Sequence, residues 1–441
     1  MQSPPRTPQM ILVLGFLGVL CGVPLGQVGL ELYRGEPVQF TDLFRYVPAE
    51  RSLRRFERAL EEKWWGWQTV RPWTQRLFFE LLGDMGAKGL TGREGWVFYK
   101  PGVRYLVERD RAETGAAARP RRFGPAVEAI VRFRDQLRGR GVHLLVVPAP
   151  GKASVYPDRL TERAAGARAT FRSPTEDLLE ELRRRGVDTV DLFSLFRARR
   201  SRVPPRGGGA LYLAHDTHWT PAGAAIAAEA AARKLRALGW APKPQREYRT
   251  RRLGVIRRGD VPQMPRVPGM PEAFPAETVQ CEQVLDKAAG AMVPHAGGPS
   301  GTYSNDHLKD TPLESSVLVL GDSFCRIYQT REPRSLGRVV GRTVATGPAR
   351  GGAARRGTRR LIPGSAGFCS LLARALKAPV DYVIDDGGAA TAVRQKLSTN
   401  AEILENKKVV VWEFAERELS LGREGWRGVP LPPEPPGRTP R

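Results

Sequence analysis

Cysteine is scarce in this chain of 441 residues, which has four cysteines and no C-x-x-C pair. A zinc framework built on such pairs is therefore excluded, and so is a small fold held together by many disulfides. Cys21 lies in an apolar segment, which leaves Cys281, Cys325 and Cys369 for any bridge. The sequence alone does not say whether two of these three are joined.

Acidic residues are also few, 46 against 70 basic ones, and the formal net charge is +24. An excess of this size is common in proteins that bind nucleic acid. Here it is mostly arginine, spread along the whole length, in a chain that also has 47 glycines and 37 prolines. That pattern is typical of a GC-rich coding sequence. We therefore expect no nucleic-acid partner, whereas an anionic partner such as a membrane surface or an acidic polymer stays open.

Long apolar runs are almost absent, and the single one extends from Met10 to Leu25. It is shorter than the roughly 20 residues of a free-standing membrane span and longer than the roughly 7–15 apolar residues of a signal peptide. No A-x-A site follows it, and Leu20 before Cys21 is a poor lipoprotein cleavage signal. We predict that residues 1–30 are a signal peptide or signal anchor, retained in the membrane; a buried helix is the alternative.

The rest of the chain has the composition of a globular protein, 41% hydrophobic and 26% charged. Short apolar segments alternate with segments of helical spacing, which is typical of strands buried on both faces of a parallel sheet. These apolar segments are residues 142–150, 187–193, 315–324, 380–386 and 408–414. The pattern predicts a three-layer α/β/α fold with a mainly parallel five-stranded sheet, in which ligands bind beyond the carboxyl ends of the strands.

Composition also predicts the limits of the chain's parts. Residues 31–84 are a tryptophan-rich helical lead-in, and residues 85–428 form the main domain. Within that domain, residues 241–310 are rich in proline and glycine and are expected to be an irregular insertion, and residues 333–360 a basic loop. Residues 429–441 are a proline-rich tail with no potential to form a core.

The first candidate nucleophile is Ser323, in "VLVLGDSF". It follows directly on a buried strand, and Gly321 allows a sharp exit from that strand. A serine at the carboxyl edge of a sheet can expose its hydroxyl and direct its own N–H at a developing oxyanion. An ordinary serine that caps a helix fits the same four residues.

A serine needs a base and the base needs an orienting acceptor, and "HDTHWTPAG" (215–223) offers both. Asp216 is two residues before His218, close enough to accept a hydrogen bond from the ring nitrogen that does not face the serine. Two other interpretations stay open. His215, Asp216 and His218 could bind a metal, although their spacing is not a standard zinc pattern, or the segment could be a polar turn that starts a helix at Thr220.

Four further residues lie near the predicted carboxyl edge of the sheet: Lys152, Arg326, Gly387 and Arg394. They are candidates for oxyanion stabilisation or substrate binding because the fold places a cleft at this edge. Each also fits a simpler role in capping a helix or forming a salt bridge.

Six segments together resemble the SGNH-hydrolase-like domain of alginate O-acetyltransferases of the AlgJ/AlgX type. They are, in this order, "GREGWVFY" (92–99), "VPAPGKASVYPDRL" (147–160), "DTHWTPAGA" (216–224), "LGDSF" (320–324), "DDGGA" (385–389) and "WEFAEREL" (412–419). "FPAETV" (274–279) is similar to a further segment of these proteins. The resemblance covers about residues 85–422, and "DTHW" followed by "GDSF" is its most specific part.

The resemblance implies a catalytic triad of Asp216, His218 and Ser323. In ordinary SGNH esterases the serine comes first and Asp-x-x-His follows, whereas here Asp-x-His precedes the serine, as in the acetyltransferases. The implied reaction moves an acetyl group through an acetyl-serine onto hydroxyls of an exported polysaccharide, alginate-like or another exopolysaccharide. The implied site has no metal and no cofactor, and a partner or an acetyl ester supplies the acetyl group.

The same resemblance implies a periplasmic protein, anchored to the inner membrane by its N-terminal helix. Its partners would be the polysaccharide acceptor, a membrane-bound O-acyltransferase and other proteins of a secretion complex. The chain is more similar to the single-domain, anchored AlgJ type than to relatives with a C-terminal carbohydrate-binding module. It departs from the family at Cys325, where a small polar residue is commoner, and in the length of the 333–360 loop.

Two other functions remain open from the sequence. One is a carbohydrate acetylesterase of the same fold, which would release acetyl groups to water. The other is a non-catalytic carbohydrate-binding component of a secretion complex. Loss of a triad residue would indicate the second, and no triad residue is lost here.

Overall fold

The structure is a computed structural model that describes residues 6–38, 53, 65–107, 123–166, 171–200, 209–265, 267, 269–287, 315–330, 337–339, 364–386, 388, 390–421 and 425–431. The chain divides into two compact units. One comprises residues 1–84 and 266–270, and the other comprises residues 85–265 and 271–441.

The first unit contains two long helices, α1 (Arg6–Arg34) and α4 (Trp65–Leu82). Within α1, Met10–Arg34 is long and apolar enough to cross a membrane, and it is the only described helix of that kind. Its apolar side chains are largely exposed. These properties suit a membrane anchor or a signal sequence equally, so the predicted anchor stays a prediction.

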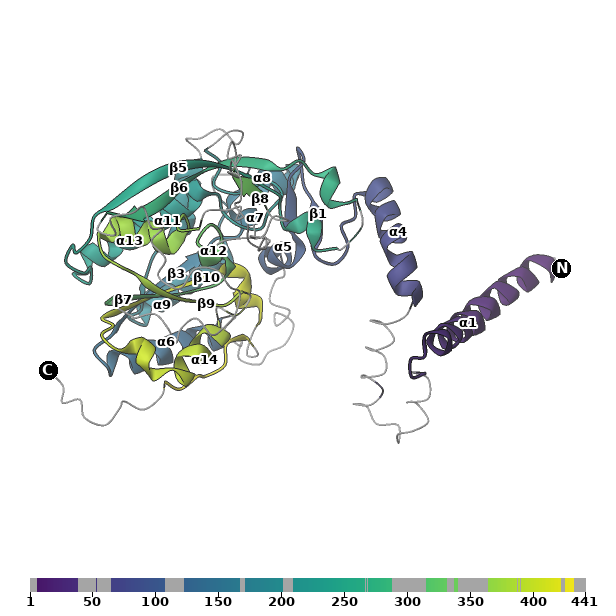
Figure 1. Ribbon diagram of the computed structural model, residues 1–441, viewed down its shortest axis with the longest axis horizontal. Helices are drawn as coiled ribbons and strands as arrows, with labels where there is room; N and C mark the ends of the chain where they lie inside the picture. The colour runs from purple at the N-terminus through teal and green to yellow at the C-terminus, as the bar shows by residue number, and fades with distance from the viewer. Residues whose placement is uncertain are drawn as a thin grey trace, which may run out of the picture. The chain divides into compact units, whose positions relative to one another are not determined.

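The second unit is built on a five-stranded sheet in the order β4 (Asp188–Thr189), β3 (His143–Ala149), β10 (Val409–Ala415), β7 (Val317–Gly321) and β9 (Asp381–Ile384). All four neighbouring pairs are parallel. The predicted five-stranded parallel sheet is therefore confirmed, and Figure 1 shows it as the middle layer of the unit.

Helices cover both faces of this sheet (Figure 1). One face packs against α6 (Gly124–Arg138), α9 (Pro174–Arg184) and α14 (Ala392–Thr399), and the other against α10 (Leu192–Arg200), α11 (Pro221–Ala237) and α13 (Phe368–Leu376). Alternate residues of β3 pack against the two helix layers, because successive side chains of a strand point to opposite faces. Leu144 and Val146 lie in the hydrophobic cluster that includes α6, called here the α6 core. Leu145 and Val147 lie in the cluster that includes α11, the α11 core.

Helix starts follow the sequence signals. Ser173 caps α9 with a complete capping box, in which its hydroxyl accepts from Thr175 N and the Glu176 side chain accepts from Ser173 N. Thr220 caps α11 in the same position, and its hydroxyl accepts from Gly223 N. The cap of α11 fixes where the "HDTH" loop ends and the helix begins.

The segment 241–310 differs from its prediction as an irregular insertion. It contains two ten-residue strands, β5 (Tyr248–Arg257) and β6 (Glu277–Asp286), which pair antiparallel along their whole length. Figure 1 shows this pair lying over α11 and α13. The prediction was wrong here because the prolines and glycines of the segment lie mostly outside the strands, and pairing between distant segments is hard to foresee from composition.

Two other predicted segments are described only in part. In the basic loop 333–360, Gly337–Val339 forms β8 and pairs with the end of β5; the rest of that loop lies outside the described residues. In the tail, residues 432–441 also lie outside them, whereas Val429 is buried. The tail therefore contributes to the core at its first residue.

Replacing Leu182 by alanine tests the packing of α9 on the sheet. The side chain is fully buried in the α6 core, so Leu182→Ala is expected to lower the free energy of unfolding by about 2–5 kcal/mol. Arg184→Ala on the same helix is the control, because the Arg184 side chain is 72% exposed and its ion pair is worth about 0–1 kcal/mol. Urea unfolding measures both, and equal losses would contradict this packing.

Candidate active site

Ser323 lies directly beyond β7, as the first residue of the short helix α12 (Ser323–Arg326). Asp322 caps this turn, because its Oδ1 accepts from Phe324 N at 2.8 Å and its Oδ2 accepts from Ala415 N at 2.9 Å. A side chain at Gly321 would bring its Cβ within 2.5 Å of Cys325 Sγ. The turn therefore requires glycine there, and the serine hydroxyl is held at the carboxyl edge of the sheet.

His218 and Asp216 meet Ser323 at this edge, although 105 residues separate His218 from the serine. His218 Nε2 is 2.8 Å from Ser323 Oγ, and His218 Nδ1 is 2.6 Å from Asp216 Oδ1. Asp216 Oδ1 also accepts from the His218 main-chain N–H at 3.1 Å. The three side chains form one hydrogen-bonded chain, in the order expected of an acid, a base and a nucleophile.

Asp216 is fully buried, and a neighbouring guanidinium helps to keep it charged. Arg257, at the end of β5, donates from Nε to Asp216 Oδ2 at 3.0 Å and is itself 3% exposed. Burial alone would raise the pKa of Asp216, but the charge of Arg257 and the interactions with His218 outweigh it. They hold the pKa well below its ordinary value, so the orienting acceptor stays ionised at neutral pH.

A further carboxylate, Asp260, lies near the same His218 ring nitrogen as Asp216. It accepts from Thr217 N and from Thr217 Oγ1, both at 2.7 Å, and its Oδ2 is 3.5 Å from His218 Nδ1. Burial and the neighbouring charge of Asp216 raise the pKa of Asp260. Thr217 Oγ1 is itself 3.1 Å from His218 Nδ1, so Asp260 and Thr217 together limit how the ring can turn.

Asp216, His218 and Asp260 are also close enough to surround a metal ion, since their ligand atoms lie within 4.8 Å of one another. The contacts favour a hydrogen-bonded chain instead. Asp216 Oδ2 faces a guanidinium and its Oδ1 faces the imidazole, and a fixed positive charge at this distance opposes a cation. His215, the other ligand considered from the sequence, directs its two ring nitrogens at Gly95 O and Pro275 O, each at 3.0 Å.

Lys152 binds the loop that carries Asp216. Its Nζ donates to the carbonyl oxygens of Leu213, Ala214 and Asp216 at 3.0, 2.9 and 2.7 Å. Burial lowers the pKa of Lys152 to about 8, although neighbouring acids oppose the shift. Lys152 was predicted to bind substrate or the oxyanion, and these contacts give it a structural role at the loop.

The β5–β6 pair binds the same loop through its main-chain N–H groups. Glu277, the first residue of β6, accepts from Ala214 N at 2.8 Å and from His215 N at 2.9 Å. Arg257 and Asp260 come from the same segment. Three charged groups of the predicted irregular insertion therefore fix the position of Asp216 and His218.

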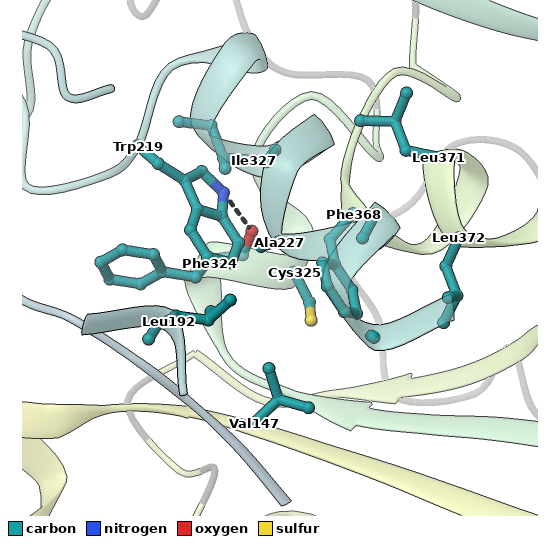
Figure 2. Packing of buried hydrophobic residues seen from close by; sticks show 14 of the residues in the cluster. Val147, Leu192, Trp219, Ala227, Phe324, Cys325, Ile327, Phe368, Leu371 and Leu372 are labelled. Atoms are coloured by element: carbon teal, nitrogen blue, oxygen red, sulfur yellow. Dashed lines mark hydrogen bonds between the residues drawn. The ribbon is translucent and has the colours of Figure 1, made fainter. Parts of the chain in front are cut away.

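Trp219 connects the loop that carries His218 to the turn that carries Ser323. Its ring is fully buried, and its Nε1 donates to Phe324 O at 3.1 Å, as Figure 2 shows with a dashed line. The Trp219 and Phe324 rings meet edge to face with centroids 5.0 Å apart. Because Trp219 follows His218 and Phe324 follows Ser323, this contact fixes the distance between base and nucleophile.

The remaining predicted residues have other roles or are not described. Arg394 donates to Ala390 O and Arg427 O and lies over the Trp412 ring. Among the described contacts, none joins it to Asp216, His218 or Ser323. Arg326 donates from Nε to both carboxylate oxygens of Asp386, which ties α12 to the end of β9. Gly387 lies outside the described residues.

A small pocket of about 30 Å³, partly open to solvent, lies beside these groups. Its lining includes Tyr99, Lys152, Thr217, Glu416 and Arg417. Thr217 joins the pocket to His218, to which it is hydrogen-bonded.

Arg257, Asp260, Glu277 and Arg417 were not predicted from the sequence. Arg417 had a signal, because it follows the strand of residues 408–414 in "WEFAEREL" and so lies at the ligand-binding edge. Glu277 had a weaker one, the alternation of polar and apolar residues in "ETVQCEQVLD" that is typical of a strand, whereas Arg257 and Asp260 had no such local signal.

A family model described as "SGNH hydrolase-like domain, acetyltransferase AlgX" matches residues 90–360, more than half of the chain. A protein of Pseudomonas aeruginosa named "probable alginate O-acetylase AlgJ" is 28% identical over 240 residues, which are 53% of this chain and 54% of that protein. That match spans only about half the length of the relative.

A second relative, the protein of the same name from Pseudomonas putida, is 24% identical over 428 residues, 94% of this chain and 91% of that protein. Among solved structures, the O-acetyltransferase domain of Pseudomonas putida AlgJ is 19% identical, with a TM-score of 0.49. It covers 75% of this chain and 91% of that chain.

Arg257→Met tests whether the guanidinium keeps Asp216 charged. Removing one partner of a buried ion pair leaves the other uncompensated, so we expect the free energy of unfolding to fall by about 3–5 kcal/mol. The control is Arg258→Met, because the neighbouring Arg258 is 54% exposed and 3.7 Å from Glu272. Adding Asp216→Asn to Arg257→Met should recover part of the loss in urea unfolding. Equal losses for Arg257→Met and Arg258→Met would contradict the role of the pair.

Glu418 provides a test by pH. Burial raises the pKa of Glu418 to about 7, with Asp322 adding to the shift and Arg417 opposing it. The folded protein then binds more protons than the unfolded chain between the ordinary value near 4.5 and about 7, so this group lowers stability as pH rises through that window.

Glu418→Gln removes that dependence. We expect the variant and the native protein to be similar at about pH 4.5, and the variant to be more stable by about 3 kcal/mol at about pH 8. Urea unfolding across this range measures the difference, and Glu128→Gln on the exposed side of α6 is the control. A difference that does not change with pH would show that Glu418 titrates normally.

Proposed function

The chain belongs to the family of SGNH hydrolase-like acetyltransferase domains of the AlgX type, and on this basis we propose that it is a polysaccharide O-acetyltransferase. The observation that carries the proposal is the hydrogen-bonded chain from Asp216 through His218 to Ser323. The relatives named alginate O-acetylase support an acceptor of that kind, alginate or a similar exported polysaccharide.

The first half of the reaction acetylates Ser323. His218 Nε2 takes the hydroxyl proton as Ser323 Oγ attacks the carbonyl carbon of an acetyl ester, and a new C–O bond forms. Asp216 stabilises the imidazolium through Nδ1. The tetrahedral intermediate then collapses, the bond to the leaving group breaks, and the leaving oxygen takes the proton from His218.

The second half transfers the acetyl group to the acceptor. A hydroxyl of the polysaccharide gives its proton to His218 Nε2 and attacks the acetyl-serine carbonyl. The bond to Ser323 Oγ breaks, and the serine recovers the proton. No net charge or electron is left on the enzyme, and no cofactor is required by this sequence of steps.

Both halves develop negative charge on a carbonyl oxygen, which needs hydrogen-bond donors at that position. The Ser323 main-chain N–H is a donor for this purpose. The N–H groups that follow it, Phe324 and Cys325, donate to Asp322. By contrast, no hydrogen bond joins the Ser323 N–H to another described residue.

The proposed setting is the periplasmic side of the inner membrane. The apolar helix Met10–Arg34 would hold the enzyme there, and the acetyl group would arrive from a membrane-bound O-acyltransferase within a secretion complex. The relatives' role in alginate biosynthesis supports this setting.

The proposal is tested by incubating the full-length protein with an activated acetyl ester and locating the adduct by peptide mass spectrometry. An acetyl group is expected on Ser323. Ser323→Ala should abolish it, and His218→Ala should slow its formation by on the order of 10⁴-fold. Ser420→Ala, an exposed serine on the η8 turn (Glu416–Leu421), is the control.

Adding oligosaccharide acceptors to the acetylated enzyme separates transfer from hydrolysis. Transfer predicts acetylated oligosaccharide and faster loss of the adduct as acceptor is added. Release to water at a rate that no acceptor changes would instead identify an esterase. An adduct that persists in Ser323→Ala would refute the assignment of the nucleophile.

A further inference from the structure

Arg417 lies at the boundary between the pocket and the serine turn. It is a partly buried residue of η8, directly beyond the carboxyl end of β10, and it lines the pocket. Its guanidinium carbon is 5.5 Å from the centroid of the Tyr99 ring and 5.5 Å from that of the Phe324 ring. Tyr99 belongs to the pocket and Phe324 follows Ser323, so Arg417 connects the two.

Arg417 differs from Arg200, Arg257 and Arg326 in its partners. Arg200, Arg257 and Arg326 each contact a carboxylate: Asp158, Asp216 and Asp386 respectively. No described carboxylate lies within 4.0 Å of the Arg417 guanidinium, and its described contacts are the two rings. Within the part of the chain that the structure describes, Arg417 therefore forms no close ion pair, although its charge opposes the rise in the pKa of Glu418.

The acidic neighbours of Arg417 in the sequence are engaged elsewhere or weakly charged. Glu416 turns away and accepts from Gly151 N at 2.6 Å, Ser173 Oγ at 2.6 Å and Thr175 Oγ1 at 3.0 Å. Glu418 is 5% exposed, and burial raises its pKa to about 7. An external anion is the remaining partner for Arg417.

The pocket has the chemistry to bring such an anion to the acetyl-serine. Much of its wall is apolar, including Phe98, Val103 and Leu106. Low polarity strengthens an ion pair, and a guanidinium fork matches the two oxygens of a carboxylate. Thr217, on the same wall, is hydrogen-bonded to His218 Nδ1, and Phe324, which Arg417 contacts, directly follows Ser323, so an acceptor bound here lies beside the triad.

We propose that Arg417 binds the carboxylate of an acidic sugar in the acceptor and so selects a uronate polymer over a neutral one. This inference rests on the proposed function and adds the residue that determines its specificity. A neutral sugar in the pocket would leave the guanidinium without a partner, and such an unpaired group is penalised more strongly than a lost apolar contact.

The test uses full-length protein and the variants Arg417→Gln and Arg417→Lys, with Arg163→Gln as the control. Arg163 is exposed on the short turn η3 (Glu162–Ala164), so its replacement removes one charge away from the pocket. Two rates are measured: acetylation of Ser323 by an activated acetyl ester, and acetyl transfer to oligouronates or to neutral glucan oligosaccharides of equal length.

Arg417→Gln is expected to raise the KM for oligouronates about 10- to 100-fold, the loss of one charge-assisted contact, and to leave acetylation of Ser323 within about twofold. Arg417→Lys should recover part of the loss, because a lysine retains the charge without the fork. Transfer to neutral oligosaccharides should not change, and Arg163→Gln should resemble the native protein.

Two results would overturn the proposal. One is oligouronate transfer by Arg417→Gln with a native KM. The other is an equal slowing of Ser323 acetylation, which would place Arg417 at the oxyanion. If the native protein forms no acetyl-serine, the proposed function fails, and calorimetry still decides this inference. Oligouronate should then bind the native protein and Arg163→Gln but not Arg417→Gln, and equal or absent binding would refute it.

Discussion

The charge of one buried carboxylate, Asp216, is the constraint on which the site depends. A fully buried aspartate would ordinarily take up a proton, and a neutral acid would no longer stabilise an imidazolium. Arg257 on one oxygen and His218 on the other keep it ionised. Lys152 adds a second positive group at the same loop, where it binds the Asp216 carbonyl. The charges of the site therefore compensate one another, and Ser323 lies at the end of the hydrogen-bonded chain.

The parallel sheet supplies the other half of the geometry. Ser323 and Arg417 follow neighbouring strands, β7 and β10, and so reach the same edge. Asp322 joins those two strand ends, since it receives a hydrogen bond from Ala415 N and donates its own N–H to Glu413 Oε2 at 3.2 Å. The Trp219 contact and the β5–β6 pair hold the loop that carries Asp216 and His218 at that edge. These contacts hold the loop at the sheet edge and so limit the motion of His218 relative to Ser323.

Much of this was predictable because the signals are local. Short apolar segments indicated the five strands, and the turn after "VLVL" together with Asp216 and His218 indicated the nucleophile and its base. Arg257 and Asp260 could not be predicted in this way, since their role depends on pairing between β5 and β6 and on the docking of that pair over the loop. The role of Arg394 was misjudged for a related reason: its place after β9 suggested the cleft, whereas its side chain packs on Trp412. Strand order and side-chain direction determine the role of such residues, and neither can be predicted from the local sequence.

Chemistry at this site depends on the activation of Ser323 by His218, which an ionised Asp216 orients. The most direct measurement is the rate at which a sulfonyl fluoride modifies the native protein, with the modified residue identified by peptide mass spectrometry. We expect modification at Ser323, slowed by on the order of 10³-fold or more in His218→Ala and slowed to a smaller extent in Arg257→Met. Modification of a different residue, or a rate at Ser323 that His218→Ala does not change, would contradict it.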